Sequence, residues 1–380
     1  MVNKLKLRTA ITSMTCLVVA MGFGRFALTP QLPHMILEGQ ITLTQASLLA
    51  AANFLGYLLG AIETISAKRH LILRLKSGLW GSGIILVLSA LIPFNAEGIY
   101  VNLFLRFMAG IASAWVFVLI STWVQNQLHD EHALRTTAFS GPGAGIFLTG
   151  IIALALDALH TYVAVNWLVF GIVALLGSFI VHKDLPSSLP EVSTEKSFPM
   201  TSDSHRLFLS YALCGFGYIL PATFLSKLAV DQFPSSLLAD AFWPLFGFSV
   251  LAGMFFLATR HNIKSPQKWL AAIFCIQGMG ILACSVLHGL VGLLLGALMV
   301  GGSFMMILQL TMRLGAGLAP DHLRAMAAVL TTGFAMGQLA GPLMSGLSTH
   351  LYSSMTPALL LAAFASFFAA WLVFFIKTTH

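Results

Sequence analysis

Residues 22–30 read Gly-Phe-Gly-Arg-Phe-Ala-Leu-Thr-Pro, and residues 215–221 read Gly-Phe-Gly-Tyr-Ile-Leu-Pro. The two strings begin 193 positions apart in a chain of 380 residues, and each lies inside a long apolar stretch. Glycine loosens a helix and proline removes a backbone hydrogen-bond donor, so both stretches are expected to bend easily. Apolar helices interrupted in this way at matching positions of two halves are typical of the binding region of a membrane transporter. The pair of strings therefore predicts a duplicated membrane protein.

The composition supports a membrane environment. Apolar residues make up 58% of the chain and charged residues 9%, against about 25% charged residues in a soluble domain. The apolar runs are long and continuous rather than alternating, which favours helices over a membrane barrel. We expect an all-α polytopic membrane protein with about twelve transmembrane helices in two pseudo-repeated six-helix bundles. The expected spans are 9–35, 43–65, 77–95, 99–123, 136–157, 161–181, 207–229, 236–258, 268–288, 290–312, 324–347 and 353–376.

The positive charges predict the orientation. With these spans, all but three of the twenty Lys and Arg residues fall on one side of the membrane, and the exceptions are Lys227, Arg25 and Arg106. By the positive-inside rule both termini are expected in the cytoplasm, in a multi-pass protein of the cytoplasmic (bacterial inner) membrane. The net charge of +7 is then a consequence of orientation, and no nucleic-acid partner is expected.

The domain organisation follows from one polar segment. Residues 182–206 are rich in serine and contain Pro186, Pro190 and Pro199, so they are expected to form a flexible cytoplasmic linker. It separates an N-terminal bundle, residues 1–181, from a C-terminal bundle, residues 207–380. The first apolar run is too long for a signal peptide and lacks a small-residue cleavage site, so we expect it to remain as span one.

The four cysteines all fall within spans and form no Cys-x-x-Cys pair, so neither disulfides nor metal ligands are expected. No phosphate-binding loop is present. We expect no cofactor, no metal and no enzymatic activity. The expected partners are a small-molecule substrate and the lipid bilayer, with protons as an open alternative, and the functional unit is expected to be a monomer.

Arg25 is the strongest candidate for a site residue. It lies near the middle of span one, where a charge costs about 3 kcal/mol on insertion scales. Its planar guanidinium suits a carboxylate or phosphate, which suggests that it anchors an anionic substrate. The alternative is structural, with hydrogen bonds to carbonyls freed by Pro30 and Pro33 or an internal ion pair with an acidic residue.

Other polar residues in the spans are weaker candidates. Arg106 in span four is a second anchor or a coupling residue, with snorkelling to the outer interface as the alternative. Tyr218 matches Arg25 in the repeated string and is expected to oppose it. Other candidate substrate contacts are Thr29, Asn53 and Thr223, which bond neighbouring helices in the alternative interpretation. Candidate coupling carboxylates are Asp240 and Glu63.

Glycines and prolines in three spans are expected to serve gating or close packing, since small residues let helices approach. They are Gly22, Gly24, Pro30, Pro33, Gly215, Gly217, Pro221, Gly141 and Pro142.

Over nearly its full length the chain resembles the major facilitator superfamily, and the strings at 22–33 and 215–224 resemble its YbfB-type branch. Arg106 and Gly110 match the Arg-x-x-x-Gly motif of span four, whose arginine the resemblance links to proton coupling. Gly141-Pro142 with Gly145 partly matches a span-five motif associated with exporters and antiporters. The resemblance implies the two-bundle fold and secondary transport, without a substrate.

The resulting hypothesis is a secondary transporter that moves a small organic anion by alternating access. Export of hydrophobic or drug-like compounds is the alternative, favoured by the span-five motif and by aromatic and Met-rich spans. A membrane-embedded enzyme and a sensor with a transporter fold remain as remote alternatives.

Overall fold

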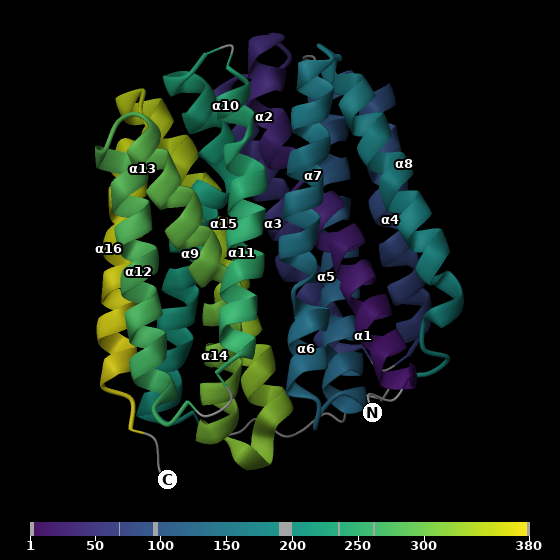
Figure 1. Ribbon diagram of the computed structural model, residues 1–380, viewed down its shortest axis with the longest axis vertical. Helices are drawn as coiled ribbons and strands as arrows, with labels where there is room; N and C mark the ends of the chain where they lie inside the picture. Colours follow the sequence, from purple (N-terminus) through teal and green to yellow (C-terminus); the bar gives the residue numbers. More distant parts are fainter. Residues whose placement is uncertain are drawn as a thin grey trace.

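The computed structural model describes residues 4–67, 69–93, 98–189, 200–234, 236–260 and 263–377. Within these residues the regular structure is helical throughout, and twelve helical segments are long and apolar enough to cross a membrane. The predicted helical membrane fold is thus confirmed. The long helices run side by side along the longest axis, and both ends of the chain lie at the same end of the molecule (Figure 1). We call this end the terminal side and the opposite end the far side.

The first six spans gather in one bundle, on the right in Figure 1. Its helices pack in the pairs α3–α5, α4–α8 and α4–α5. The elements are α1 (Lys4–Leu17), the π-helix η1 (Val18–Phe23), α2 (Leu28–Leu37), α3 (Leu43–Ser66), α4 (Leu71–Leu91), α5 (Gly98–Gln127), α6 (His132–Phe139), α7 (Gly141–Ala158), α8 (Val163–Val181) and the 3-10 turn η2 (His182–Asp184).

The last six spans form the second bundle, on the left in Figure 1. Here the main packed pairs are α9–α15, α12–α16 and α9–α16. The elements are α9 (Ser202–Gln232), α10 (Leu237–Asp240), α11 (Phe242–Ala258), α12 (Pro266–Val286), α13 (Leu290–Leu295), η3 (Gly296–Val300), α14 (Gly301–Leu318), η4 (Pro320–His322), α15 (Leu323–Tyr352) and α16 (Thr356–Phe374).

The two bundles touch through α3–α15, α7–α11 and α2–α9. Small residues permit this contact: a Cβ added to Gly150 on α7 would lie 2.5 Å from the nitrogen of Pro244 on α11. Likewise a Cβ on Gly247 of α11 would lie 2.3 Å from the nitrogen of Phe147. Such distances leave no room for a side chain, so the backbones of α7 and α11 are in direct contact.

Span one is interrupted near the predicted position. Its α-helical pattern ends at Leu17, continues as η1, and passes through a turn at residues 24–27 before α2 begins. π-helical segments often occur at functional sites. Span seven differs, because α9 runs without interruption through Gly215, Gly217 and Pro221. The two copies of the string therefore have different backbones.

Several helices are longer than expected. α5 continues to Gln127 and α14 to Leu318, because polar residues that end a hydropathy pattern need not end a helix that projects beyond the bilayer. Of the predicted linker, 182–206, residues 190–199 lie outside the described residues, and α9 begins at Ser202 within the stretch assigned to the linker.

Candidate functional site

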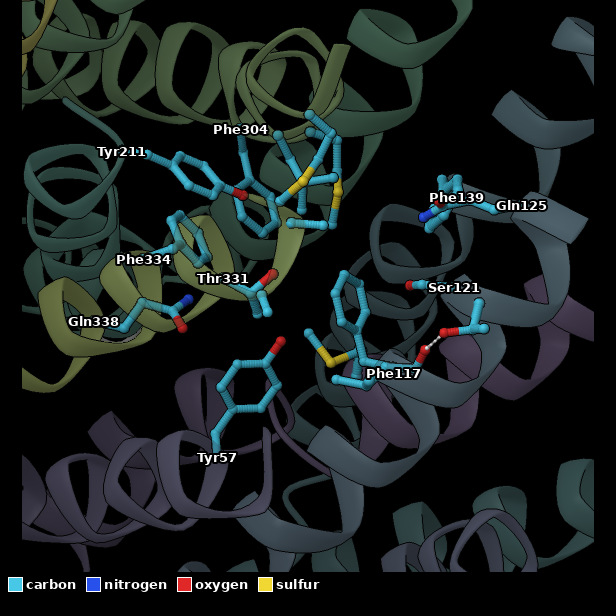
Figure 2. Close-up of a pocket in the computed structure, with 18 of the residues that line it drawn as sticks. Tyr57, Phe117, Ser121, Gln125, Phe139, Tyr211, Phe304, Thr331, Phe334 and Gln338 are labelled. Atoms are coloured by element: carbon cyan, nitrogen blue, oxygen red, sulfur yellow. Dashed lines mark hydrogen bonds between the residues drawn. The ribbon is translucent and has the colours of Figure 1, made fainter. Parts of the chain in front are cut away.

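A cavity of about 210 Å³ lies between the two bundles. Its lining comes from span one, α3, α5 and α6 of the first bundle and from α9, α14 and α15 of the second. Figure 2 shows Tyr57 and Phe117 on the first-bundle side, facing Tyr211, Phe304, Phe334 and Gln338 of the second bundle. The cavity is thus shared by both halves of the chain.

Arg25 lines this cavity. It is the second residue of the turn that follows the π-helix η1. It is only 3% exposed. Its guanidinium carbon lies 3.8 Å from the ring centroid of Tyr57 and 4.7 Å from that of Phe54, both on α3. Among the described residues no carboxylate forms an ion pair with it, and its Nε has no hydrogen-bond partner. The cation is therefore held by aromatic faces and not neutralised.

Gln338 on α15 connects Arg25 to Tyr218. The Nη2 of Arg25 donates to Oε1 of Gln338 at 2.7 Å, and Nε2 of Gln338 donates to the hydroxyl of Tyr218. All three side chains are buried and line the cavity. The chain of contacts orients the guanidinium without cancelling its charge, because a neutral amide accepts the hydrogen bond.

Four aromatic rings form the wall of the second bundle. Tyr218 stacks on Phe304 with centroids 4.3 Å apart and on Phe334 at 5.5 Å, and Phe334 stacks on Tyr211 at 4.5 Å. Phe117 faces this wall from α5 (Figure 2). The cavity consequently combines one cation, a few hydroxyl and amide groups, and a large apolar surface.

Toward the far side the cavity is closed by contacts between the bundles. Phe26 of span one packs edge-on against Phe304, with ring centroids 6.3 Å apart, and at a tilt against Trp243, with centroids 6.4 Å apart. The hydroxyl of Thr29 donates to the carbonyl of Ala222 at 2.9 Å. These contacts lie just beyond Arg25 along span one and join it to the second bundle.

Toward the terminal side the cavity continues into a second one of about 490 Å³. The residues that line both are Gln125, Phe139, Leu308, Met312 and Ala327. Three arginines line this second cavity: Arg135, Arg260 and Arg313. Among the described residues that line either cavity, none is acidic. The route from the terminal side to Arg25 is thus positively charged.

Comparison with known families agrees with this architecture. The family described as "Uncharacterised MFS-type transporter YbfB" matches residues 17–374. The chain belongs to this family. It is therefore a multi-pass membrane protein of the major facilitator superfamily, with the twelve-helix fold of that transporter superfamily. No curated protein matches the sequence.

In this MFS-type transporter Arg106 lies away from both cavities. Its Nη2 donates to Ser89 Oγ at 2.5 Å, and its guanidinium lies over the ring of Trp167 at 4.7 Å. It is 1% exposed, inside the first bundle between α4, α5 and α8. In this conformation Arg106 lines neither cavity, so it is not in the position of a second anchor, and it does not snorkel to an interface.

The other polar candidates lie in helix contacts of the transporter. Thr29 bonds across the bundles, as described above. Asn53 Nδ2 donates to the carbonyl of Arg106 at 3.1 Å, and Thr223 is buried on α9 outside the lining of both cavities. The structure brings Arg25 and Tyr218 together at the cavity but leaves these three away from it.

The two candidate coupling carboxylates, Glu63 and Asp240, lie at opposite ends of the molecule. Glu63 accepts hydrogen bonds from Arg74 Nε at 2.8 Å and from Trp115 Nε1 at 2.9 Å, near the terminal side. Asp240 lies at the far side, with His34 Nε2 3.3 Å from its Oδ1. Glu63 thus ties α3 to α4 and α5, while Asp240 is in contact with the other bundle.

The predicted gating glycines are packing positions in this conformation. A Cβ on Gly22 would lie 2.3 Å from Gly145 Cα, and one on Gly215 would lie 2.3 Å from the carbonyl oxygen of Phe334. A Cβ added to Gly24 would lie 2.9 Å from Ser82 Oγ, one added to Gly217 would lie 2.5 Å from Ser366 Oγ, and one added to Gly141 would lie 2.6 Å from Leu17 Cβ. Pro30 and Pro33 are buried in α2, Pro142 begins α7, and Pro221 is inside α9.

Three residues at the cavity escaped the sequence analysis: Gln338, Tyr57 and Tyr211. Gln338 directly follows Gly337, in a span that also contains Gly333 and Gly341. A buried amide between such glycines is a signal that would have drawn attention to it. Tyr57 and Tyr211 are amphipathic aromatics whose orientation the sequence does not encode locally.

One group of described residues has its possible ligand atoms close enough for a metal ion. The atoms of His34, Asp157 and Asp240 lie within 4.8 Å of one another. The two ring nitrogens of His34 face different carboxylates, however, with Nδ1 at 3.5 Å from Asp157 and Nε2 at 3.3 Å from Asp240. A hydrogen-bonded bridge fits this orientation better than ligation of a single ion.

Proposed function

We propose that this protein is a secondary transporter that carries a small organic anion with an apolar body across the cytoplasmic membrane by alternating access. From the positive-inside rule we take both termini to be cytoplasmic, so that the terminal side is the cytoplasmic side. The conformation described above is then open toward the cytoplasm and closed toward the outside. The observation that carries the proposal is an unneutralised Arg25 at a cavity shared by the two bundles.

The electrostatics favour an anion over a cation. Burying an unpaired charge is costly, and an anionic ligand at Arg25 would offset that cost. The guanidinium still has donors beyond the one bonded to Gln338. Arg135, Arg260 and Arg313 would attract an anion from the cytoplasm, although the positive-inside rule alone also explains their position.

The walls favour a substrate with an apolar or planar body. Phe117, Phe304 and Phe334 present ring surface to the cavity, and Met21 and Met305 add polarizable thioethers. A cavity of about 210 Å³ suits a compact solute. We therefore expect Arg25 to hold the acidic group, with the hydroxyl of Tyr218 and the amide of Gln338 near it.

Ligand pairs that differ only in charge test the proposal. Thermal stabilisation of purified protein is measured with an aromatic carboxylate, its neutral amide and the corresponding amine. The carboxylate is expected to stabilise the native protein and not Arg25→Gln. Equal stabilisation by the amide would contradict the proposal. Uptake or counterflow of the same carboxylate in liposomes then tests transport, with Arg25→Ala expected to abolish saturable uptake.

Export of hydrophobic or drug-like compounds is the second candidate. It is supported by the apolar part of the lining, in particular the stack of Phe304, Tyr218 and Phe334. Drug susceptibility of cells that lack or overproduce the protein separates the two candidates. A change in resistance to neutral compounds that survives Arg25→Gln would favour export.

A further inference from the structure

The far side of the molecule carries a polar cluster outside the proposed anion pathway. It consists of His34 on α2, Asp157 at the end of α7, and Asp240 at the end of α10. His34 and Asp157 belong to the first bundle and Asp240 to the second. The side chains of His34 and Asp240 are 17% and 9% exposed, so both are shielded but still in reach of solvent.

The imidazole lies between the two carboxylates. Its Nδ1 is 3.5 Å from Asp157 Oδ1, and its Nε2 is 3.3 Å from Asp240 Oδ1. A neutral imidazole has one N–H donor and one bare nitrogen, whereas the protonated ring donates from both nitrogens. With a neutral ring, one carboxylate would face a lone pair. With both carboxylates ionised, the arrangement is therefore complete when His34 carries a second proton.

The surrounding charges point in the same direction. The carboxylates that act electrostatically on His34 are Asp240, Asp157 and Glu38, and Asp240 also acts on Asp157. Two ionised carboxylates that face each other repel, so the pair favours a bound proton or a cation between them.

Further ionisable groups lie on the neighbouring elements. His160, in the loop after α7, acts on Asp157. On α9 the groups near this end are Lys227 and Asp231, which pair with each other. α8 and α11 contain no charged residue, and the charged residue of α3, Glu63, lies at the opposite end. The carboxylates around His34 thus outnumber the cations that face it.

The neighbouring contacts between the bundles are neutral. They are the hydrogen bond from Thr29 to Ala222 and that from Trp243 Nε1 to Thr149 Oγ1 at 3.4 Å. Neither changes with pH in the physiological range. The contact between His34 and Asp240 joins the bundles and does depend on a proton.

We propose that His34, Asp157 and Asp240 form a proton-binding site whose occupancy keeps the far side of the transporter closed. The proton bound by His34 ties Asp240 of the second bundle to Asp157 of the first. Loss of this proton leaves a bare ring nitrogen against a carboxylate and lets the bundles separate there. The inference rests on the proposed transport function, since an opening on the far side presupposes alternating access.

Linkage sets the sign and the limit of the effect. Because protonation stabilises the closed far side, opening must weaken the binding of the proton. A rise in pH on the far side therefore favours opening. For one proton, the ratio of open to closed molecules rises by at most tenfold per pH unit.

Distance measurements between spin labels test the proposal without a substrate. Labels are placed at Tyr162→Cys in the first bundle and Tyr352→Cys in the second, two exposed far-side positions outside the cluster. The four native cysteines are replaced by alanine, and EDTA is present throughout. Between pH 5 and pH 8.5 the long-distance population is expected to grow along a one-proton titration curve in the protein with native His34.

Two variants and a control decide the outcome. His34→Gln removes the titrating group and is expected to make the distances independent of pH, and Asp240→Asn is expected to reduce the closed population at pH 5. His288→Gln, which alters an exposed imidazole in the α12–α13 loop, is expected to leave the titration unchanged.

An unchanged titration in His34→Gln, or constant distances in the native protein, would overturn the proposal. A closed population that is missing at pH 5 in EDTA and appears only when a divalent metal ion replaces the EDTA would also overturn it, since a metal would then be the ligand. No anion is added, so these outcomes are independent of anion binding at Arg25. A protein that titrates here but binds no carboxylate would contradict only the proposed substrate.

Discussion

The Nη2 of Arg25 donates a hydrogen bond of 2.7 Å to Oε1 of Gln338, a residue 313 positions further along the chain. The bond joins the turn of span one to α15 of the other bundle at the central cavity. A bond between the two bundles at this point must break or be rearranged when they rock against each other. The same contact can therefore serve to orient the guanidinium and to report which conformation the transporter adopts.

Replacing each of two buried arginines by lysine distinguishes a residue of the anion site from a residue with a structural role. Arg25→Lys keeps a positive charge but loses the planar fork and its stacking on Tyr57. Charge-assisted hydrogen bonds contribute about 1.5–3 kcal/mol each, so carboxylate affinity is expected to fall about 10- to 100-fold. Isothermal titration with purified protein gives the affinity.

Arg106→Lys is the matched control, because Arg106 is equally buried in the same bundle but contacts Ser89 and Trp167. Arg106→Lys is expected to change carboxylate affinity less than threefold. Its main effect is expected to be a change in the melting temperature of the protein. A larger loss of affinity in Arg106→Lys than in Arg25→Lys would place the anion elsewhere.

Gln338→Glu places a carboxylate where the neutral amide now accepts the bond from Arg25. The new ion pair neutralises the guanidinium, so carboxylate binding is expected to be lost while the fold is retained. Gln338→Leu leaves Arg25 charged but less well oriented. It is expected to weaken carboxylate binding only about tenfold, which corresponds to a loss of about 1.4 kcal/mol of binding free energy. Thermal shift with the carboxylate measures both variants, and equal binding by the two would show that the charge of Arg25 is not needed.

Tyr218→Phe removes the hydroxyl that accepts the bond from Gln338 Nε2 and keeps the ring stacked on Phe304. A single buried hydrogen bond is worth about 0.5–1.5 kcal/mol, so the KM for uptake is expected to rise about two- to tenfold. The maximal rate should stay within a factor of two if the hydroxyl only positions the anchor. If the maximal rate instead falls strongly while KM is unchanged, the hydroxyl of Tyr218 acts in the conformational step.

Gly22→Ala tests the contact between span one and α7. The new Cβ would lie 2.3 Å from Gly145 Cα, and such overpacking costs about 1–3 kcal/mol. Gly317→Ala is the control, because a Cβ there meets nothing within 4 Å, and alanine in a helix is favoured over glycine by about 0.5–1 kcal/mol. Melting in detergent is expected to shift downward for the first and upward or not at all for the second.

Hydropathy was sufficient for the fold class. A run of about twenty apolar residues has few stable states in a bilayer other than a spanning helix, and twelve such helices are found in the described residues. Helix ends were less predictable, as α5 and α14 show, because a polar residue can continue a helix into water. The different backbones of the two Gly-Phe-Gly strings were also beyond the reach of local patterns, since neighbouring helices determine which one bends.

For the site, the sequence singled out Arg25 and Tyr218 by a buried charge and by the internal repeat. It also named Arg106, as a weaker candidate, because Arg106 is the other arginine within a span. The structure separates the two, because α5 is rotated so that Arg106 faces Ser89 and Trp167. Hydropathy along a strongly apolar helix carries little information about such rotation.

The sequence by itself determined that this chain spans the membrane about twelve times, in two related halves, with a positive charge buried in the first span. These properties depend on composition and on residues close together in the chain. Only the tertiary structure decided that Arg25 meets Gln338, that Arg106 does not reach the cavity, and that His34 contacts Asp240. The physical reason is that such contacts arise when helices distant in sequence pack, and packing selects one rotation and one set of neighbours for each helix.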